Sequence, residues 1–132
     1  MNVKNSTTIS NSTVVEECNS FRITYPTKTN LKWTDNTCYK IKYQVNNSRP
    51  DDAKIYVSLM NAEGEYVGTL VNGAETSKTS KSIPFNLYLG AHPLDGDYYL
   101  SVKFSNGMEC AAKNTPLIHV THKVNSTYPK CH

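Results

Sequence analysis

Four histidines are the residues best suited to metal or acid–base chemistry, and their spacing argues against a shared site. His119 and His122 are three residues apart. On a helix this spacing can place two side chains on one face, whereas on a strand an odd separation points them to opposite faces. His92 lies beside Pro93, and His132 stands alone in a polar segment. We therefore predict neither a metal site nor a cofactor.

The closest acidic pairs are Asp51 with Asp52 and Asp95 with Asp97. A glycosidase needs two carboxyl groups set about 5–9.5 Å apart across a cleft. Asp95-Gly96-Asp97 has the composition of a turn, and Asp51-Asp52 that of an exposed loop with too few oxygen ligands for calcium. The sequence also lacks the Gly-x-Ser-x-Gly motif of serine hydrolases and a glycine-rich phosphate loop. We therefore expect a protein that is not an enzyme.

Aromatic side chains offer the clearest means of binding, because a flat ring can stack on a sugar ring through CH–π contact. The chain has nine tyrosines and one tryptophan. Tyr39, Tyr43 and Trp33 are expected in the core. The tyrosines that remain as candidates for a glycan-binding platform are Tyr66, Tyr88 and Tyr99. Half-exposed tyrosines are also ordinary in β-sheets, and the sequence alone favours that interpretation over a platform.

The cysteines and glycosylation sequons indicate the compartment. Four cysteines stand at positions 18, 38, 110 and 131, and none forms the Cys-x-x-Cys pair of a zinc ribbon or thioredoxin site. The Asn-x-Ser/Thr sequons begin at Asn5, Asn11, Asn46 and Asn125. Widely spaced cysteines in such a chain are typical of disulfides formed in an oxidising compartment. We predict a secreted glycoprotein with two disulfides, for which three connectivities are open.

Charge and hydropathy exclude two other classes of function. Fourteen basic and eleven acidic residues leave a formal net charge of +3. The lysines are scattered along the chain, which is typical of a solvated face and not of a nucleic-acid site. No apolar run approaches the roughly 18–20 residues that cross a bilayer. We therefore expect no nucleic-acid partner and no transmembrane segment.

The elements that would position these residues are short strands, because apolar and polar residues alternate in most of the chain after residue 17. The expected strands cover residues 21–25, 38–45, 54–60, 65–71, 82–89, 98–104 and 117–121. Pro84 predicts a sheet edge or a bulge in its strand, and Asn72-Gly73 predicts a turn after residue 71. Residues 1–17 are polar and without periodicity, which predicts a flexible glycosylated leader ahead of a single domain at 18–132. About seven strands with regular turn signals predict an all-β sandwich of the immunoglobulin or fibronectin class.

Three segments carry a resemblance to a known family. They are Ile23-Thr24-Tyr25-Pro26-Thr27 with Trp33 downstream, Leu94-Asp95-Gly96-Asp97-Tyr98-Tyr99-Leu100-Ser101-Val102, and Asn114-Thr115-Pro116-Leu117-Ile118-His119-Val120. Their order and spacing resemble the N-terminal immunoglobulin-like domain of the yeast cell-wall 1,6-β-glucan assembly family, with its Ser/Thr-rich GPI-anchored fungal relatives. The resemblance implies a non-catalytic protein of the fungal cell wall that binds polysaccharide or contributes to wall assembly. The alternative is a secreted effector or recognition module that binds an extracellular protein.

An immunoglobulin-like topology, if the resemblance holds, also selects a disulfide pairing. In that topology the last strand runs beside the first, and both point the opposite way to the second and the penultimate strands. Cys18 and Cys110 then lie at one end of the sandwich, and Cys38 and Cys131 at the other. The expected disulfides are Cys18–Cys110 and Cys38–Cys131.

Overall fold

The computed structural model of the chain describes residues 18–46, 50–76, 81–90, 94–107, 110–123 and 131. The predicted leader at 1–17 and the sequons at Asn5, Asn11 and Asn125 lie outside the described residues, whereas Asn46 is described and exposed. No helix in the described part of the chain has the length and apolar character needed to cross a membrane.

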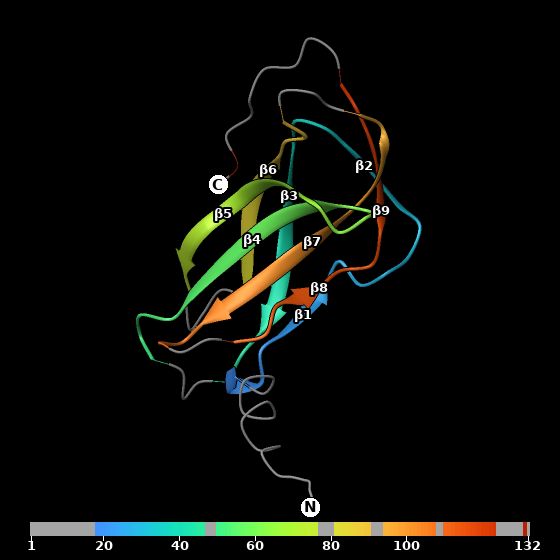
Figure 1. The fold of residues 1–132 in the computed structure, drawn as a ribbon. Coiled ribbons are helices and arrows are strands. Elements are labelled where there is room, and N and C mark those ends of the chain that lie inside the picture. The colour runs from blue at the N-terminus through green and yellow to red at the C-terminus, as the bar shows by residue number, and fades with distance from the viewer. Residues whose placement is uncertain are drawn as a thin grey trace, which may run out of the picture.

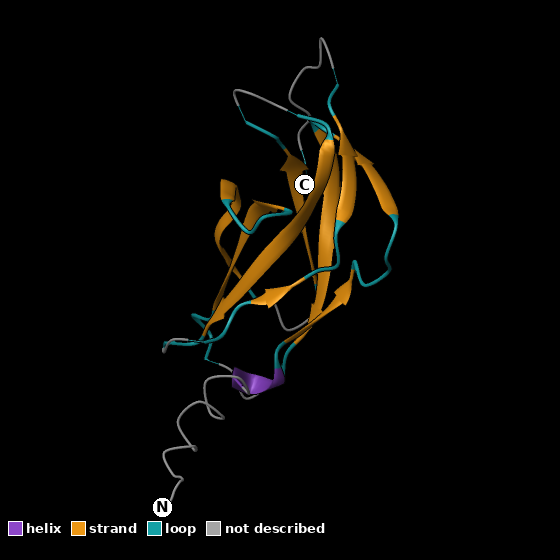
Figure 2. Cartoon of the chain, turned by 45° about the vertical axis from the view of Figure 1, so that its right-hand side comes forward, coloured by secondary structure: helices purple, strands orange, loops and turns teal. Residues whose placement is uncertain are grey.

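Two β-sheets make up the described fold, as the sequence predicted. A short 3-10 turn, η1 (Cys18–Ser20), precedes a three-stranded sheet of β1 (Arg22–Tyr25), β3 (Thr37–Gln44) and β6 (Ser82–Leu87). The other sheet has the order β2 (Leu31–Thr34), β9 (Ile118–Thr121), β7 (Gly96–Ser105), β4 (Lys54–Asn61) and β5 (Tyr66–Glu75), with β8 (Lys113–Asn114) paired to β7. Figure 1 shows β5, β4 and β7 crossing in front of β3 and β6, and Figure 2 shows the strands after a turn of 45° about the vertical axis. The fold is therefore a β-sandwich.

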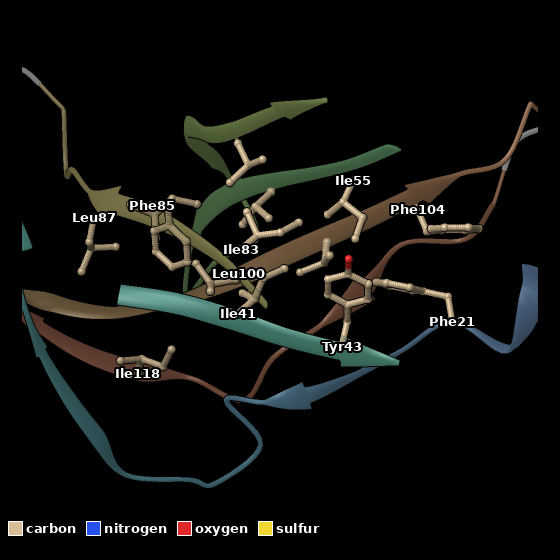
Figure 3. Packing of buried hydrophobic residues seen from close by; sticks show 14 of the residues in the cluster. Phe21, Ile41, Tyr43, Ile55, Ile83, Phe85, Leu87, Leu100, Phe104 and Ile118 are labelled. Atoms are coloured by element: carbon tan, nitrogen blue, oxygen red, sulfur yellow. The ribbon is translucent and has the colours of Figure 1, made fainter. Parts of the chain in front are cut away.

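Alternating apolar side chains from both sheets form the core (Figure 3). Ile41 and Tyr43 of β3 face Leu100 and Phe104 of β7, and all four are at most 1% exposed. Phe21 stacks on Phe104 with ring centroids 5.2 Å apart. Full burial of such a side chain contributes about 1.5–3 kcal/mol, so the strict alternation of β3 and β7 is what joins the sheets.

The strand that lies beside the last strand differs from the prediction. The segment at β1 pairs only with β3, and β9 pairs in parallel with β2. Pro26 follows β1 and has no N–H to continue the ladder with β3. The chain therefore leaves the three-stranded sheet after Tyr25 and enters the other sheet as β2, which takes the place expected for the first strand.

The predicted turn at Asn72-Gly73 is also wrong, because β5 continues through both residues to Glu75. Gly73 has a φ of 83° and lies where the β4–β5 register shifts between Ile55 and Tyr56. An Asn-Gly pair accommodates positive φ equally well in a turn and in a bulge. Pro84 is confirmed at an edge, since β6 is an outer strand of its sheet.

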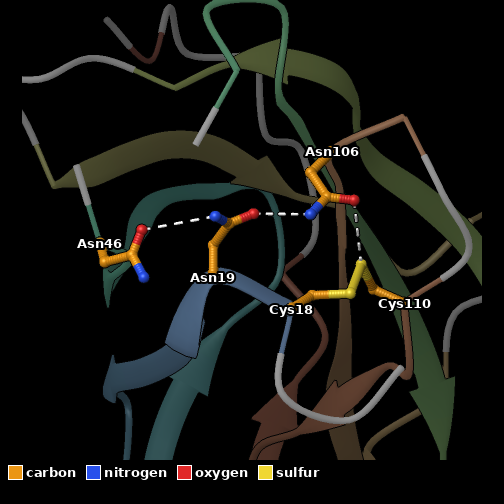
Figure 4. Close-up of a disulfide and its surroundings, with 5 residues drawn as sticks. All are labelled: Cys18, Asn19, Asn46, Asn106 and Cys110. Atoms are coloured by element: carbon orange, nitrogen blue, oxygen red, sulfur yellow. Dashed lines mark hydrogen bonds between the residues drawn. A yellow bond between two sulfur atoms is a disulfide. The ribbon is translucent and has the colours of Figure 1, made fainter. Parts of the chain in front are cut away.

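Both predicted disulfides are present. Cys18–Cys110 has a Cα–Cα distance of 6.0 Å, and Cys38–Cys131 one of 5.4 Å. Around the first, three asparagines join the ends of three chain segments (Figure 4): Asn106 donates from Nδ2 to Oδ1 of Asn19 at 2.6 Å, and Asn19 donates to Oδ1 of Asn46 at 3.4 Å. These contacts fix the end of the sandwich at which the chain enters β1.

Candidate functional site

Strand β5 presents every third residue to the outside of the sandwich. Its exposed positions are Tyr66, Thr69, Asn72 and Glu75, and their partners on β4 are every second residue: Met60, Ser58, Tyr56 and Lys54. Three register shifts along this pair account for the difference. A bulge sets two residues opposite one and restores the outward direction of the next side chain. The outer surface of β5 and β4 is therefore a regular grid in spite of the irregular strand.

Strand β7 extends this grid on the other side of β4. Directly paired residues on neighbouring strands point to the same face of a sheet. Met60 pairs with Tyr66 of β5 and with Tyr99 of β7, so that two tyrosines flank one methionine in a single row. We call the resulting surface the tyrosine face. It comprises Tyr56, Ser58, Met60, Tyr66, Thr69, Asn72, Tyr99 and Ser101.

The tyrosine face has the dimensions of an oligosaccharide site. Strands lie about 4.8 Å apart, so the backbone positions of Tyr66 and Tyr99 are roughly 10 Å apart. Tyr56 stands four residues from Met60 along β4, which is roughly 13 Å. These spacings exceed one sugar ring and fit a short chain.

Each tyrosine of this face has a neighbour that limits its position. The hydroxyls of Tyr66 and Thr69 are 2.6 Å apart, and Tyr66 is 62% exposed. The hydroxyl of Tyr99 reaches the turn between β4 and β5, where a Cβ added to Gly64 would lie 3.6 Å from it. The Tyr56 ring lies over Gly73, with Cε2 only 3.2 Å from an added Cβ. The Gly73 bulge therefore leaves room for Tyr56.

A polar groove continues the same sheet surface over β7, β9 and β2. Its volume is about 810 Å³, and it is lined by Thr29, Asn30, Lys32, Asp97, Leu117, His119 and Thr121. His119 and Lys32 are direct partners on β9 and β2. Nδ1 of His119 lies 3.1 Å from a carboxylate oxygen of Asp97, and both side chains are about half exposed. Such groups donate and accept hydrogen bonds to sugar hydroxyls.

The predicted platform tyrosines are divided by the structure. Tyr66 and Tyr99 share one row, whereas Tyr88 follows β6 and lines a cleft of about 360 Å³ with Val67, Gly68, Thr69, Leu70, Asn86 and Gly90. The cleft touches the tyrosine face only at Thr69. Tyr56 was not among the predicted site residues. Its position between the core residues Ile55 and Val57 could have revealed it, because alternation points it outward.

His122 contacts a buried carboxylate and has a structural role. Nδ1 of His122 lies 2.9 Å from Asp35, whose carboxylate is buried and also accepts the backbone N–H of Leu89 at 3.0 Å. Nearby, burial raises the pKa of the Tyr98 hydroxyl, and the charges of Asp35 and Asp95 raise it further. The Tyr98 hydroxyl donates a hydrogen bond to the Leu94 carbonyl at 2.7 Å. Within the described ranges, no three His, Cys, Asp or Glu residues form a group that could hold a metal ion.

Comparison of the chain with protein-family models and with curated protein sequences gives no significant match. The resemblance to the glucan assembly family therefore stays a prediction from the sequence. The geometry of the tyrosine face and the chemistry of the side chains around it are the structural indications of function.

Proposed function

We propose that this protein is a secreted, non-catalytic carbohydrate-binding protein of the fungal cell surface, and that it binds a neutral β-glucan chain on the tyrosine face. The observation that carries the proposal is the row in which Met60 pairs with both Tyr66 and Tyr99. Two aromatic rings on a sheet surface supply stacking partners for sugar rings, and the methionine between them supplies an adaptable apolar contact.

The polar residues of the tyrosine face support a sugar as the ligand. Ser58, Thr69, Asn72 and Ser101 surround the tyrosines with hydroxyl and amide groups, which hydrogen-bond to sugar hydroxyls in either direction. The eight residues are uncharged, and Lys103, which pairs with Tyr56, and the Lys54–Glu75 pair border them on the same side of the sheet. The uncharged row at Met60 favours a neutral glycan. The adjoining groove at His119 gives room for further sugar units.

Location outside the cell is supported by the covalent chemistry. Two disulfides join the described segments, and such bonds form and persist in oxidising compartments. Asn46 begins a sequon and is exposed at the end of β3. The sequence resemblance to glucan assembly proteins supports the fungal cell wall as the particular location.

Affinity electrophoresis in gels containing soluble β-1,6-glucan or β-1,3-glucan tests the proposal. We expect retardation of the wild-type protein and a roughly five- to fifty-fold weaker interaction for Tyr66→Ala/Tyr99→Ala, because removal of a central aromatic contact commonly costs more than tenfold in affinity. Tyr88→Ala is the matched control, since Tyr88 is also exposed but lies off the face.

Four results would contradict the proposal. Unchanged mobility of the wild-type protein in every glucan would show that it does not bind this class of ligand. An equal loss of affinity for Tyr88→Ala would place the binding site at the cleft beside β6. Full binding by Tyr66→Ala/Tyr99→Ala would show that the tyrosine face is not the glucan-binding site. Capture of an extracellular protein by the same face, without glucan binding, would support a recognition module instead.

A further inference from the structure

A second groove lies on the opposite sheet, and its lining differs from that of the tyrosine face. It has a volume of about 430 Å³ and is lined by Tyr25, Cys38, Tyr39, Lys40, Lys42, Pro84 and Cys131. The groove therefore combines two ammonium groups with two tyrosines, a proline ring and a disulfide. It lies on β1, β3 and β6 and shares no residue with the proposed glucan site.

The path of the chain explains why the groove exists. β1 ends at Tyr25, which pairs with Lys42, whereas β3 extends beyond that pair to Lys40, Tyr39 and Thr37. A longer first strand would lie beside this part of β3, but the chain has crossed to the other sheet as β2. Tyr39 fills the inner side of the gap, where its ring stacks on Trp33 with centroids 4.1 Å apart. The rest of the gap stays open to solvent.

The charge of this sheet has one sign. Arg22, Lys40 and Lys42 all lie exposed in β1 and β3, and the sequences of β1, β3 and β6 contain no Asp or Glu. Lys42 lies 6.0 Å from the centre of the Tyr25 ring, a cation–π geometry. In the described part of the chain, no salt bridge pairs Lys40 or Lys42 with a carboxylate. A ligand that neutralises these ammonium groups must supply its own negative charge.

From this arrangement we infer that the groove binds an acidic polysaccharide with one carboxylate on each of several successive sugar rings. Lys40 and Lys42 are two residues apart on a strand, so their charges repeat at roughly 6.6 Å, which suits a polymer with regularly spaced anions. Tyr25 and Pro84 offer flat apolar contacts for the faces of the sugar rings. A protein with this groove and the tyrosine face binds two kinds of glycan on opposite surfaces.

Isothermal titration with polygalacturonate tests the inference, and its methyl ester serves as the neutral analogue of the same chain. We expect the wild-type protein to bind the acid and not the ester. Lys40→Gln/Lys42→Gln should weaken this binding roughly 2- to 30-fold, the sum of two exposed ion pairs. The control Lys28→Gln/Lys123→Gln removes the same charge from exposed positions outside the groove and should bind as the wild type does. Unchanged thermal unfolding of the variants shows that they fold.

Four outcomes would overturn the inference. They are no binding of polygalacturonate, equal binding of the ester, equal losses in the two lysine double variants, and equally tight binding of polyglutamate, which would indicate an acidic peptide instead. Tyr66→Ala/Tyr99→Ala should bind polygalacturonate as the wild type does. The inference of an acidic ligand and the proposed function are therefore tested independently of each other.

Discussion

Substitution of two glycines of β5 tests the bulged strand that creates the tyrosine face. Gly73 has a φ of 83°, and a Cβ there would lie 3.2 Å from Cε2 of Tyr56. Gly68 lies in the same strand, and it has no positive φ and no atom within 4 Å of an added Cβ. The two positions therefore differ in the backbone conformation and in the space available, while the chemical change to alanine is the same.

The expected effects have opposite signs. An alanine at positive φ costs about 1–2 kcal/mol, and at position 73 the ring of Tyr56 must also move. Alanine at position 68 should stabilise the protein by about 0.4–1 kcal/mol, because it restricts the unfolded chain. Urea denaturation followed by tryptophan fluorescence should therefore separate Gly73→Ala from Gly68→Ala by about 1.5–3 kcal/mol in the free energy of unfolding.

The same pair of variants also tests the link from the bulge to the site. Gly73→Ala displaces Tyr56 and should weaken glucan binding, whereas Gly68→Ala should leave it unchanged. Equal stabilities for the two variants, or a greater loss for Gly68→Ala, would refute the register of β5 and with it the grid of outward residues.

Three further predictions concern the stability of the sandwich. Asp35→Ala should lower the free energy of unfolding by about 2–4 kcal/mol, because it leaves the buried Leu89 N–H and His122 without their acceptor. The control Asp52→Ala, at an exposed loop, should change it by less than about 0.5 kcal/mol. Similar losses for both variants would contradict a structural role of Asp35. Burial raises the pKa of Tyr98, so the folded protein holds this proton more tightly than the unfolded chain does. The contribution of Tyr98 to the free energy of unfolding should be fully present below about pH 10 and should fall as pH rises further. In urea denaturation Tyr98→Phe should lose less stability at alkaline pH, and a loss identical to that of the wild type would contradict the assignment to Tyr98. Limited reduction should open Cys38–Cys131 before Cys18–Cys110, because Cys38 is exposed whereas Cys18 and Cys110 are 6% and 4% exposed; mass spectrometry of alkylated peptides would contradict the prediction if Cys18 were labelled first.

Strict alternation made the long strands predictable. In β7 every second residue from Tyr98 on is buried, and in β3 the alternate residues are half-buried or buried, so the sequence shows both the strand and its inner face. The turn after residue 71 could not be predicted correctly, because three bulges give β5 a period of three on its outer side. The short β2 also carries little sequence signal, and its parallel pairing with β9 joins segments about ninety residues apart, which no local pattern reports.

The sequence predicts only part of the candidate site. The sequence predicts Tyr66 and Tyr99 as candidate binding tyrosines, but their common row depends on the pairing of both with Met60. Tyr88 has the same chemistry and lies in a different cleft, because it belongs to the chain after β6. The second groove depends on where β1 ends relative to β3, and a crossing between sheets is a property of the whole fold.

The most direct test of the account is to locate the glycan on the folded protein. Amide and methyl chemical shifts of labelled protein would be followed during titration with a β-1,6-linked gluco-oligosaccharide. We predict changes at Met60, Tyr66, Tyr99 and Ser101, weaker changes at His119, and none at Lys40 or Lys42. Changes confined to β1, β3 and β6, or no changes at a saturating concentration of the oligosaccharide, would contradict the assignment of the tyrosine face as the glucan-binding surface.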